Sequence, residues 1–230
     1  MSELEALLEP AGLDSRIRGQ LARYGMLVLE AGHRFNLSGA KSEVEIGVHL
    51  LDSLTVIPHL AEPYVDIGSG AGFPAIPVAI VTGMATTMIE ATAKKALFLG
   101  SAMDLLGIRG QVIGERAEAA GRRPDLREHF ASGTGRALGS APTVAELLLP
   151  FIALNGAAVL QRGKTTAAER QALEDAALML GGSIEREIPL DAQRRLMVVR
   201  KAKATPIRFP RRTGVPAKRP LCAPPEKRSP

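Results

Sequence analysis

Hydrophobic positions recur along this 230-residue chain with two different spacings. Over about residues 1–60 they lie three and four positions apart, as on one face of a helix. Asp14 can accept hydrogen bonds at the start of a helix that runs to about His33. Ser42, with Glu45 three positions later, predicts a capping box and a second helix. The N-terminal part is therefore predicted to be helical.

From Tyr64 onward, short apolar runs alternate with helical patterns. Strands are expected near residues 64–67, 86–90, 110–114, 131–136, 156–161, 183–189 and 195–201. Helices are expected over residues 74–82, 93–106, about 142–153, and 166–180. Such alternation is typical of an α/β fold, a parallel sheet with helices on both faces. The last two strands have no helix between them, which indicates a closing antiparallel hairpin.

Three regions are predicted from these patterns: a helical region over 1–60, an α/β domain over 61–201, and a tail over 202–230. The tail is rich in Lys, Arg and Pro and holds a single acidic residue, Glu226. Proline opposes regular structure, so one interpretation is a disordered, solubilising tail. The other is an extended arm that binds phosphate groups.

Composition limits the classes of function. Hydrophobic residues make up 46% of the chain, enough for a core, whereas aromatic residues make up 3% and Trp is absent. The net charge of +5 and the pI of about 9.7 are compatible with an anionic partner. A single Cys excludes an internal disulfide and a Cys-based zinc cluster, and no metal site is expected. No signal peptide or membrane-spanning run is recognised, so a cytoplasmic protein without membrane contact is expected.

The stretch Val65–Pro77, V-D-I-G-S-G-A-G-F-P-A-I-P, joins the first predicted strand to a helix. Glycines can adopt positive φ and let a ligand approach the backbone closely. A dinucleotide-binding loop has the spacing G-x-G-x-x-G, but its third glycine is replaced here by Phe73. The spacing G-x-G-x-G, two residues after an acid, resembles instead the first motif of S-adenosylmethionine-dependent methyltransferases. The candidate cofactor residues of this loop are Asp66, Gly68, Gly70, Gly72 and Phe73.

Further candidates follow the next two predicted strands. Glu90 stands about twenty residues after the glycines, where a carboxylate can accept hydrogen bonds from ribose hydroxyls. Lys94 and Lys95 come at the start of a helix, against the helix dipole, which suggests an external anion. Ala117 and Glu118 are candidates for the rim of an adenine ring, although a capped helix start explains them equally well.

The fourth predicted strand is weakened by Ser and Gly and ends at Arg136, a cation that could hold a cofactor group or an RNA phosphate.

Two other patterns are weaker evidence for a functional site. His49 and Asp52 can share a helix face, and structural hydrogen bonding explains them without chemistry. The run Arg162–Thr166 suggests a phosphate-binding loop, but Ala158 occupies the position of its first glycine.

Taken together, the motifs resemble one family over nearly the whole chain, the bacterial 16S ribosomal RNA guanine-N7 methyltransferases, also named glucose-inhibited division protein B. They are N-L-S at 36–38, H-L-L-D-S-L at 49–54, the glycine loop, E-A-T-A-K-K at 90–95, R-A-E at 116–118, R-A at 136–137, and P-R-R-T-G-V-P-A-K-R-P-L in the tail. The resemblance implies a Rossmann-like class I methyltransferase sheet and S-adenosylmethionine as cofactor. It also implies N7 of the guanine at family position 527 as acceptor. The chain departs from the family at Ala75 and in the residues that begin the fourth strand.

Guanine N7 carries a lone pair and no proton, so direct in-line transfer requires no general base. We therefore assign no catalytic acid or base, and leave Arg136 as a possible catalytic residue. The expected partner is 16S rRNA or the 30S subunit, bound by a monomer. Alternatives are a non-catalytic ribosome-associated module that binds the cofactor, and a small-molecule methyltransferase. The candidate RNA-binding residues are Lys94, Lys95, Arg122, Arg123, Arg208, Arg211, Arg212, Lys218 and Arg219.

Overall fold

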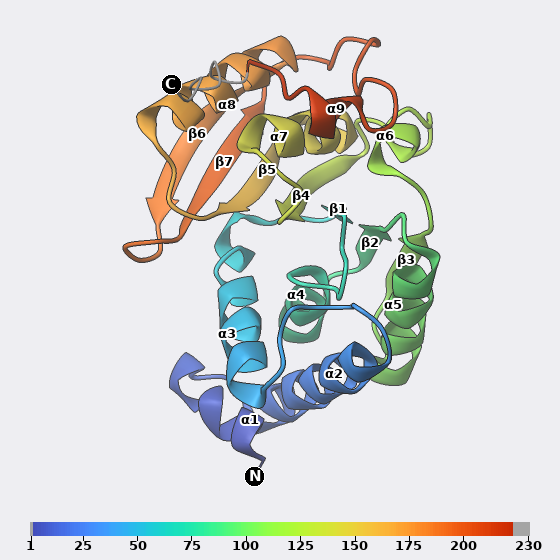
Figure 1. Cartoon of the computed structure of the whole chain (residues 1–230), viewed down its shortest axis with the longest axis vertical. Coiled ribbons are helices and arrows are strands. Elements are labelled where there is room, and N and C mark those ends of the chain that lie inside the picture. Colours follow the sequence, from blue (N-terminus) through green and yellow to red (C-terminus); the bar gives the residue numbers. More distant parts are fainter. Residues whose placement is uncertain (1, 223–230) are drawn as a thin grey trace, which may run out of the picture. The chain divides into compact units, whose positions relative to one another are not determined.

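The computed structural model describes residues 2–222 of the chain (Figure 1). The chain divides into two compact units, Met1–Glu115 and Arg116–Pro230. Each unit is described by itself. The boundaries expected from the sequence, at residues 60 and 201, stay a prediction.

The first unit holds five helices and three parallel strands among its described residues. Its strands pair in the order β3-β2-β1, with Asp66 opposite Met88 in the register. The helices are α1 (Glu3–Leu7), α2 (Ser15–Arg34), α3 (Glu43–Leu54), α4 (Ala75–Thr82) and α5 (Ala93–Leu106); short 3-10 turns span Glu9–Ala11 and Ile57–His59. The strands are β1 (Tyr64–Ile67), β2 (Thr86–Ile89) and β3 (Gly110–Ile113).

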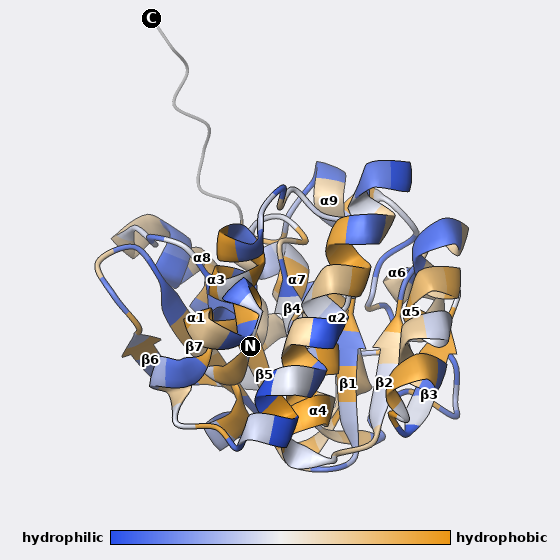
Figure 2. Cartoon of the chain, turned by 90° about the horizontal axis from the view of Figure 1, so that it is seen from below, coloured by the Kyte–Doolittle hydropathy of each residue, from blue (hydrophilic) through white to orange (hydrophobic). Residues whose placement is uncertain are grey.

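The predicted helix starts are confirmed, with one difference in detail. Asp14 accepts a hydrogen bond from the Arg16 N–H at 2.8 Å, and Ser42 accepts one from the Glu45 N–H at 3.2 Å. The capping box at α3 is only half formed, because the Glu45 carboxylate accepts from the N–H of Lys41, one residue before the cap, at 2.6 Å. Helix α4 is mostly apolar, as the orange parts of its ribbon in Figure 2 show, and its first five residues are buried.

The second unit carries four strands in the order β4-β5-β7-β6. Strands β4 and β5 are parallel, and β7 is antiparallel to both β5 and β6. Helix α7 packs on β5 and α8 on β6 (Figure 1). The strands are β4 (Phe130–Arg136), β5 (Ile152–Arg162), β6 (Gly182–Pro189) and β7 (Arg195–Lys201). The helices are α6 (Ala117–Ala120), α7 (Ala141–Leu148), α8 (Ala167–Met179) and α9 (Val215–Lys218), with a 3-10 turn at Leu149–Phe151.

The predicted fold class is confirmed: the seven strands make a mixed, mostly parallel sheet that ends in an antiparallel hairpin. Strand β4 forms despite its poor propensity, with a register shift between Phe130 and Ser132. Among the described residues, no helix is both long enough and apolar enough to cross a membrane.

The C-terminal tail contradicts one interpretation of the sequence. Over residues 202–222 it is not an unattached, disordered tail, because side chains of the second unit hold its backbone. Helix α9 forms within it even though Pro is frequent, since Pro216 stands in the first turn, where its missing N–H costs little. Residues 223–230 of the predicted tail lie outside the described part.

Candidate functional site

The glycine loop joins β1 to α4 and is held against the end of β2. The N–H groups of Gly68 and Ser69 both donate to the Ile89 carbonyl, at 2.8 and 3.2 Å. The Ser69 hydroxyl donates to the Asp66 carbonyl at 3.1 Å, and Asp66 itself is buried. All three glycines predicted to matter have positive φ: 62° at Gly68, 57° at Gly70 and 98° at Gly72. The loop geometry therefore needs glycine at each of these positions.

Glu90 binds this loop directly. One carboxylate oxygen, Oε2, accepts the Gly70 N–H at 2.8 Å, and the other, Oε1, accepts the Thr92 N–H at 2.7 Å. The residue is only 7% exposed. Each carboxylate oxygen has a second lone pair for a further donor, such as a ribose hydroxyl. The sequence placed Glu90 near the glycines, and the structure brings the two into hydrogen-bond contact.

Gly70 and Gly72 face different surroundings. A Cβ built on Gly70 would have a single neighbour within 4 Å, the Gly68 carbonyl oxygen at 3.8 Å. A Cβ on Gly72 would come within 2.6 Å of Ile76, 2.9 Å of the Tyr24 hydroxyl and 3.0 Å of Leu99. Gly70 thus borders open space, a cradle that a side chain would fill, whereas Gly72 is enclosed by the core. A small-molecule cofactor fits on the Gly70 side of the loop.

Phe73 has its ring in the core of the first unit, at 9% exposure. The ring lies 5.4 Å from the rings of both Tyr24 and His49, and the Tyr24 hydroxyl donates to the Ala71 carbonyl at 2.5 Å. Tyr24 and Thr92, which support the loop, were not predicted from the sequence. Nothing in the spacing of Tyr24 sets it apart from a core position. His49 contributes this ring contact, and hydrogen bonding by His49 and Asp52 stays a prediction.

Lys94 and Lys95 occupy the first turn of α5, just after Glu90 and Thr92. Lys94 is exposed and Lys95 is half-buried. The helix cap at Thr92 has no side-chain hydrogen bond. Because the positive end of the helix dipole lies here, two cations are unfavourable unless an anion is near.

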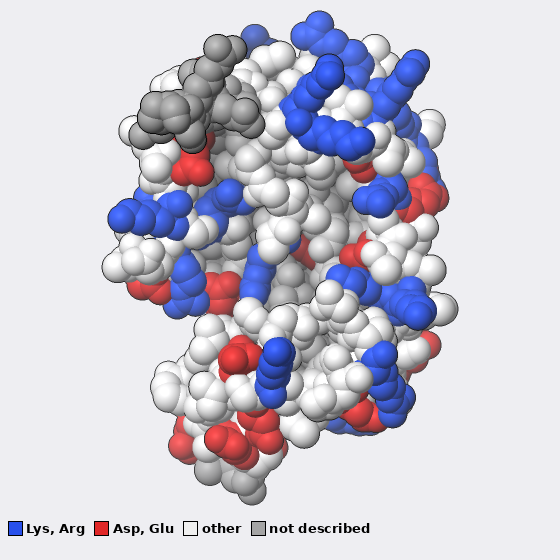
Figure 3. Space-filling view, viewed as in Figure 1, with Lys and Arg blue, Asp and Glu red and all other residues white. Residues whose placement is uncertain are grey.

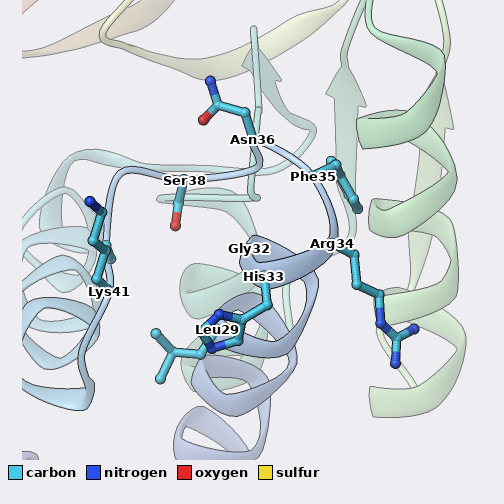
Figure 4. A pocket seen from close by; sticks show the side chains of 9 residues that line it. Leu29, Gly32, His33, Arg34, Phe35, Asn36, Ser38 and Lys41 are labelled. Carbon is cyan, nitrogen blue, oxygen red and sulfur yellow. The ribbon is translucent and has the colours of Figure 1, made fainter.

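A hollow of about 500 Å³ lies at the turn between α2 and α3, where the N-L-S motif stands (Figure 4). The Ser38 side chain points toward Leu29 and His33 of α2, while the Asn36 side chain points away from them. The buried Ser38 hydroxyl has no hydrogen-bond partner among the described residues. The motif therefore lines this hollow, a feature that the sequence did not predict.

The second unit carries the remaining predicted cofactor residues. Ala117 is the first residue of α6, where backbone N–H groups lack partners within the helix. Glu118 is 8% exposed, and its Oε1 accepts the Gly214 N–H of the C-terminal segment at 2.8 Å. Arg136 ends β4 and is half-buried. The next residue, Ala137, has φ 57°, a strained left-handed conformation of the kind that clusters at functional sites.

The predicted RNA-binding arginines separate into two groups. Arg122 donates to backbone carbonyls of the C-terminal segment, including Pro210 at 2.6 Å, and Arg123 pairs with Asp125 at 2.6 Å. Arg211 binds the fully buried Glu146 at 2.6 Å. The four other predicted RNA-binding cations of the segment are exposed: Arg208, Arg212, Lys218 and Arg219.

Comparison with known proteins identifies the family. The family described as rRNA small subunit methyltransferase G matches residues 17–197 of this chain. The chain belongs to the rRNA small subunit methyltransferase G family. Relatives of that name from Pelotomaculum thermopropionicum and Deinococcus deserti are 36% and 37% identical to it. These alignments cover 88% and 91% of this chain and 90% and 91% of the relatives.

Solved structures agree with the fold. A methyltransferase from Pyrococcus furiosus has a TM-score of 0.56 at 11% identity, covering 81% of this chain and 98% of that chain. The geranyl diphosphate C-methyltransferase from Streptomyces coelicolor A3(2), solved with S-adenosyl-L-homocysteine, has a TM-score of 0.55 at 12% identity, covering 72% and 86%. As a member of the rRNA small subunit methyltransferase G family, the chain is an S-adenosylmethionine-dependent methyltransferase of small-subunit rRNA.

Proposed function

We propose that this enzyme methylates N7 of one guanine in 16S rRNA, at the position numbered 527 in the family. Cofactor binding is supported by one observation above all: Glu90 accepts hydrogen bonds from the Gly70 and Thr92 N–H groups beside the open space at Gly70. The acceptor half is supported by membership of the family over residues 17–197. When bound, S-adenosylmethionine supplies a methyl group on a positively charged sulfur, ready for attack by a lone pair.

The first unit would hold the cofactor through the predicted loop residues. Gly68 and Gly70 allow close approach of the backbone, while Gly72 and Phe73 fix the loop on the core. Asp66 supports the loop from the end of β1, and the Glu90 carboxylate would accept hydrogen bonds from ribose hydroxyls. In the second unit we assign Ala117 and Glu118 to the adenine rim and Arg136 to a cofactor group or RNA phosphate.

Direct transfer to N7 makes modest chemical demands on the protein. Because N7 carries no proton, the side chains need only hold the base and the methyl group in line and exclude water. Methylation of pyrimidine C5 would instead need a cysteine nucleophile at the site. The single Cys222 is exposed and contacts Met179 Sδ at 3.5 Å, and burial raises the pKa of its thiol. This thiol is poorly suited to such attack, which argues against a pyrimidine C5 acceptor.

For RNA binding, the exposed cations are the stronger candidates. Lys94, Arg208, Arg212, Lys218 and Arg219 can reach phosphates without breaking an ion pair that holds the fold. Lys95 is half-buried, and Arg122, Arg123 and Arg211 are engaged with protein groups, so we propose that these four contribute less to RNA binding. We further propose that the enzyme acts in the cytoplasm as a monomer.

Methyl-transfer assays test the proposal. Purified protein is incubated with labelled S-adenosylmethionine and either naked 16S rRNA or 30S particles, and the product is mapped by mass spectrometry. We expect one N7-methylguanosine, and we expect the same nucleoside to be lost from rRNA of a deletion strain. Cofactor binding without transfer to either substrate would favour a non-catalytic module instead. Transfer to another atom of the base would refute the N7 assignment.

A further inference from the structure

The C-terminal segment, residues 202–222, is attached to the second unit mainly through its backbone. Arg127 donates to the carbonyls of Thr205 at 2.7 Å and Phe209 at 2.9 Å, and Arg122 donates to those of Arg208 and Pro210. Thr205, Phe209 and Leu221 of the segment are buried, and the Arg211 side chain binds the buried Glu146, whereas other cationic side chains of the segment are exposed. Contacts with the second unit therefore fix the backbone of the segment, and the exposed side chains of the segment form its outer face.

That outer face is cationic. Arg208, Arg212, Lys218 and Arg219 are exposed, and in the described part of the chain no acidic side chain forms an ion pair with them. Figure 3 shows Lys and Arg gathered at the top of the view, over α9 and the loops beside it. Two of the carboxylates that bind the segment, Glu146 and Glu118, are buried. The face thus presents uncompensated positive charge to a polyanion.

The same segment reaches the candidate cofactor residue Glu118. The Gly214 N–H donates to Glu118 Oε1 at 2.8 Å, and Gly214 adopts φ 79°, a conformation that glycine tolerates. Arg212 stands two residues before Gly214, and Lys218 four residues after it. The exposed cations therefore flank the one turn that holds the buried carboxylate.

We propose that the Gly214–Glu118 hydrogen bond couples RNA binding to cofactor binding. The inference rests on the proposed function, in that Glu118 is taken to meet the cofactor. RNA phosphates that bridge Arg212 and Lys218 favour the turn that holds the Glu118 carboxylate in place, so RNA strengthens cofactor binding. By thermodynamic linkage, the cofactor strengthens RNA binding by the same factor, about fivefold or more. Gly214 is in this sense a positioning residue.

The test measures affinity for S-adenosyl-L-homocysteine, which cannot donate a methyl group, by calorimetry with and without transcribed 16S rRNA. We expect the RNA to tighten binding to the wild-type protein. The variant Gly214→Pro has no N–H and cannot adopt positive φ, so its affinity without RNA is expected to fall about tenfold, the worth of a hydrogen bond to a charged acceptor. In this variant RNA should no longer tighten the binding of S-adenosyl-L-homocysteine. Gly214→Ala keeps the donor, and its Cβ meets nothing within 4 Å, so a smaller loss is expected.

A purely structural role would give a different pattern. If the hydrogen bond positions Glu118, Gly214→Pro raises the KM for S-adenosylmethionine and leaves kcat nearly unchanged. If it only stabilises the fold, the melting temperature falls and the KM does not move, which would overturn the inference. Should Gly214→Pro fail to fold, the double variant Arg212→Gln, Lys218→Gln replaces it. That variant should bind S-adenosyl-L-homocysteine normally without RNA and lose the tightening by RNA.

The two proposals fail in distinguishable ways. A wild-type enzyme that methylates rRNA at N7, but binds S-adenosyl-L-homocysteine equally with and without rRNA, overturns the coupling and leaves the proposed function intact. A protein whose cofactor affinity rises with rRNA through Gly214, but which transfers no methyl group to it, supports the coupling and refutes the proposed reaction.

Discussion

Substitution of Gly70 should separate cofactor binding from stability. In the folded chain Gly70 has φ 57°, and a Cβ at this position would have only the Gly68 oxygen near it, at 3.8 Å. Alanine there costs about 1–2 kcal/mol of folding stability, the penalty of a left-handed conformation, with no steric clash added. The new methyl group projects into the space that we assign to the cofactor. We expect Gly70→Ala to weaken S-adenosylmethionine binding at least about tenfold, and Gly70→Val to abolish it.

Two other glycines supply the matched controls. Gly107 has φ 65° and open space around its Cβ, so Gly107→Ala carries the same backbone penalty at a position away from the loop. It should lose the same stability and retain full cofactor affinity. Gly72→Ala should show a larger loss of stability, roughly 2–4 kcal/mol, because its Cβ would overlap Ile76 and the Tyr24 hydroxyl.

The measurements are isothermal titration calorimetry with S-adenosylmethionine and urea unfolding of all variants. Affinity and stability should vary independently across the series, with Gly70→Ala low in affinity and Gly72→Ala low in stability. Wild-type affinity in Gly70→Ala would refute the cradle assignment. A parallel loss of affinity in Gly107→Ala would show that the effect comes from backbone strain and not from the loop.

Three further results are expected. In Glu90→Gln the side chain keeps one acceptor oxygen, whereas the Gly70 and Thr92 N–H groups now bind two carboxylate oxygens. Calorimetry should therefore show cofactor affinity about 10–100-fold lower. An unchanged affinity would exclude ribose binding by Glu90. Arg127→Met removes the donors to four backbone carbonyls and should lower the free energy of unfolding by about 1.5–3 kcal/mol. Arg34 forms only an exposed ion pair, so Arg34→Met should change that free energy by less than about 0.5 kcal/mol. Burial raises the pKa of Glu128, but the Thr205 N–H and Lys201 outweigh it and hold that pKa below its usual value. The stability that Glu128 contributes is then present above pH 4.5 and is lost as pH falls through its lowered pKa. The difference in unfolding free energy between wild type and Glu128→Gln should therefore disappear at acid pH. A difference that stays constant with pH would contradict this.

The elements of the sheet could be predicted because each has a local cause. Strands β1 to β3 are four-residue runs between turn residues, and each contains β-branched side chains. Every expected helix from Asp14 onward begins within one residue of the observed one. Glu90 could be assigned to the loop because the carboxyl ends of neighbouring parallel strands meet at one edge of a sheet. Its hydrogen bond to Gly70 follows from that topology.

Other features depend on contacts distant in sequence, and no local pattern reveals them. Arg211 looks like any solvated arginine until the chain folds and Glu146, 65 residues earlier, lies fully buried against it. Arg122 and Arg127 likewise resemble a basic loop suited to RNA, but their guanidinium groups bind carbonyls more than 75 residues away. A count of cations therefore does not separate the side chains that bind the fold from those that are exposed, and the RNA-binding assignments stay a prediction.

The distinction between engaged and exposed cations changes how the basic C-terminus should act. If the whole cluster bound RNA, removal of any arginine would weaken binding and reduce its salt dependence alike. Because Arg211 neutralises the buried Glu146, its removal would leave an uncompensated charge in the second unit and destabilise the fold first. Loss of the exposed Arg208 or Arg212 should instead reduce the salt dependence of RNA binding and leave stability nearly unchanged. The segment is thus a structural element on its inner side, and we propose that its exposed cations bind phosphates on the outer side.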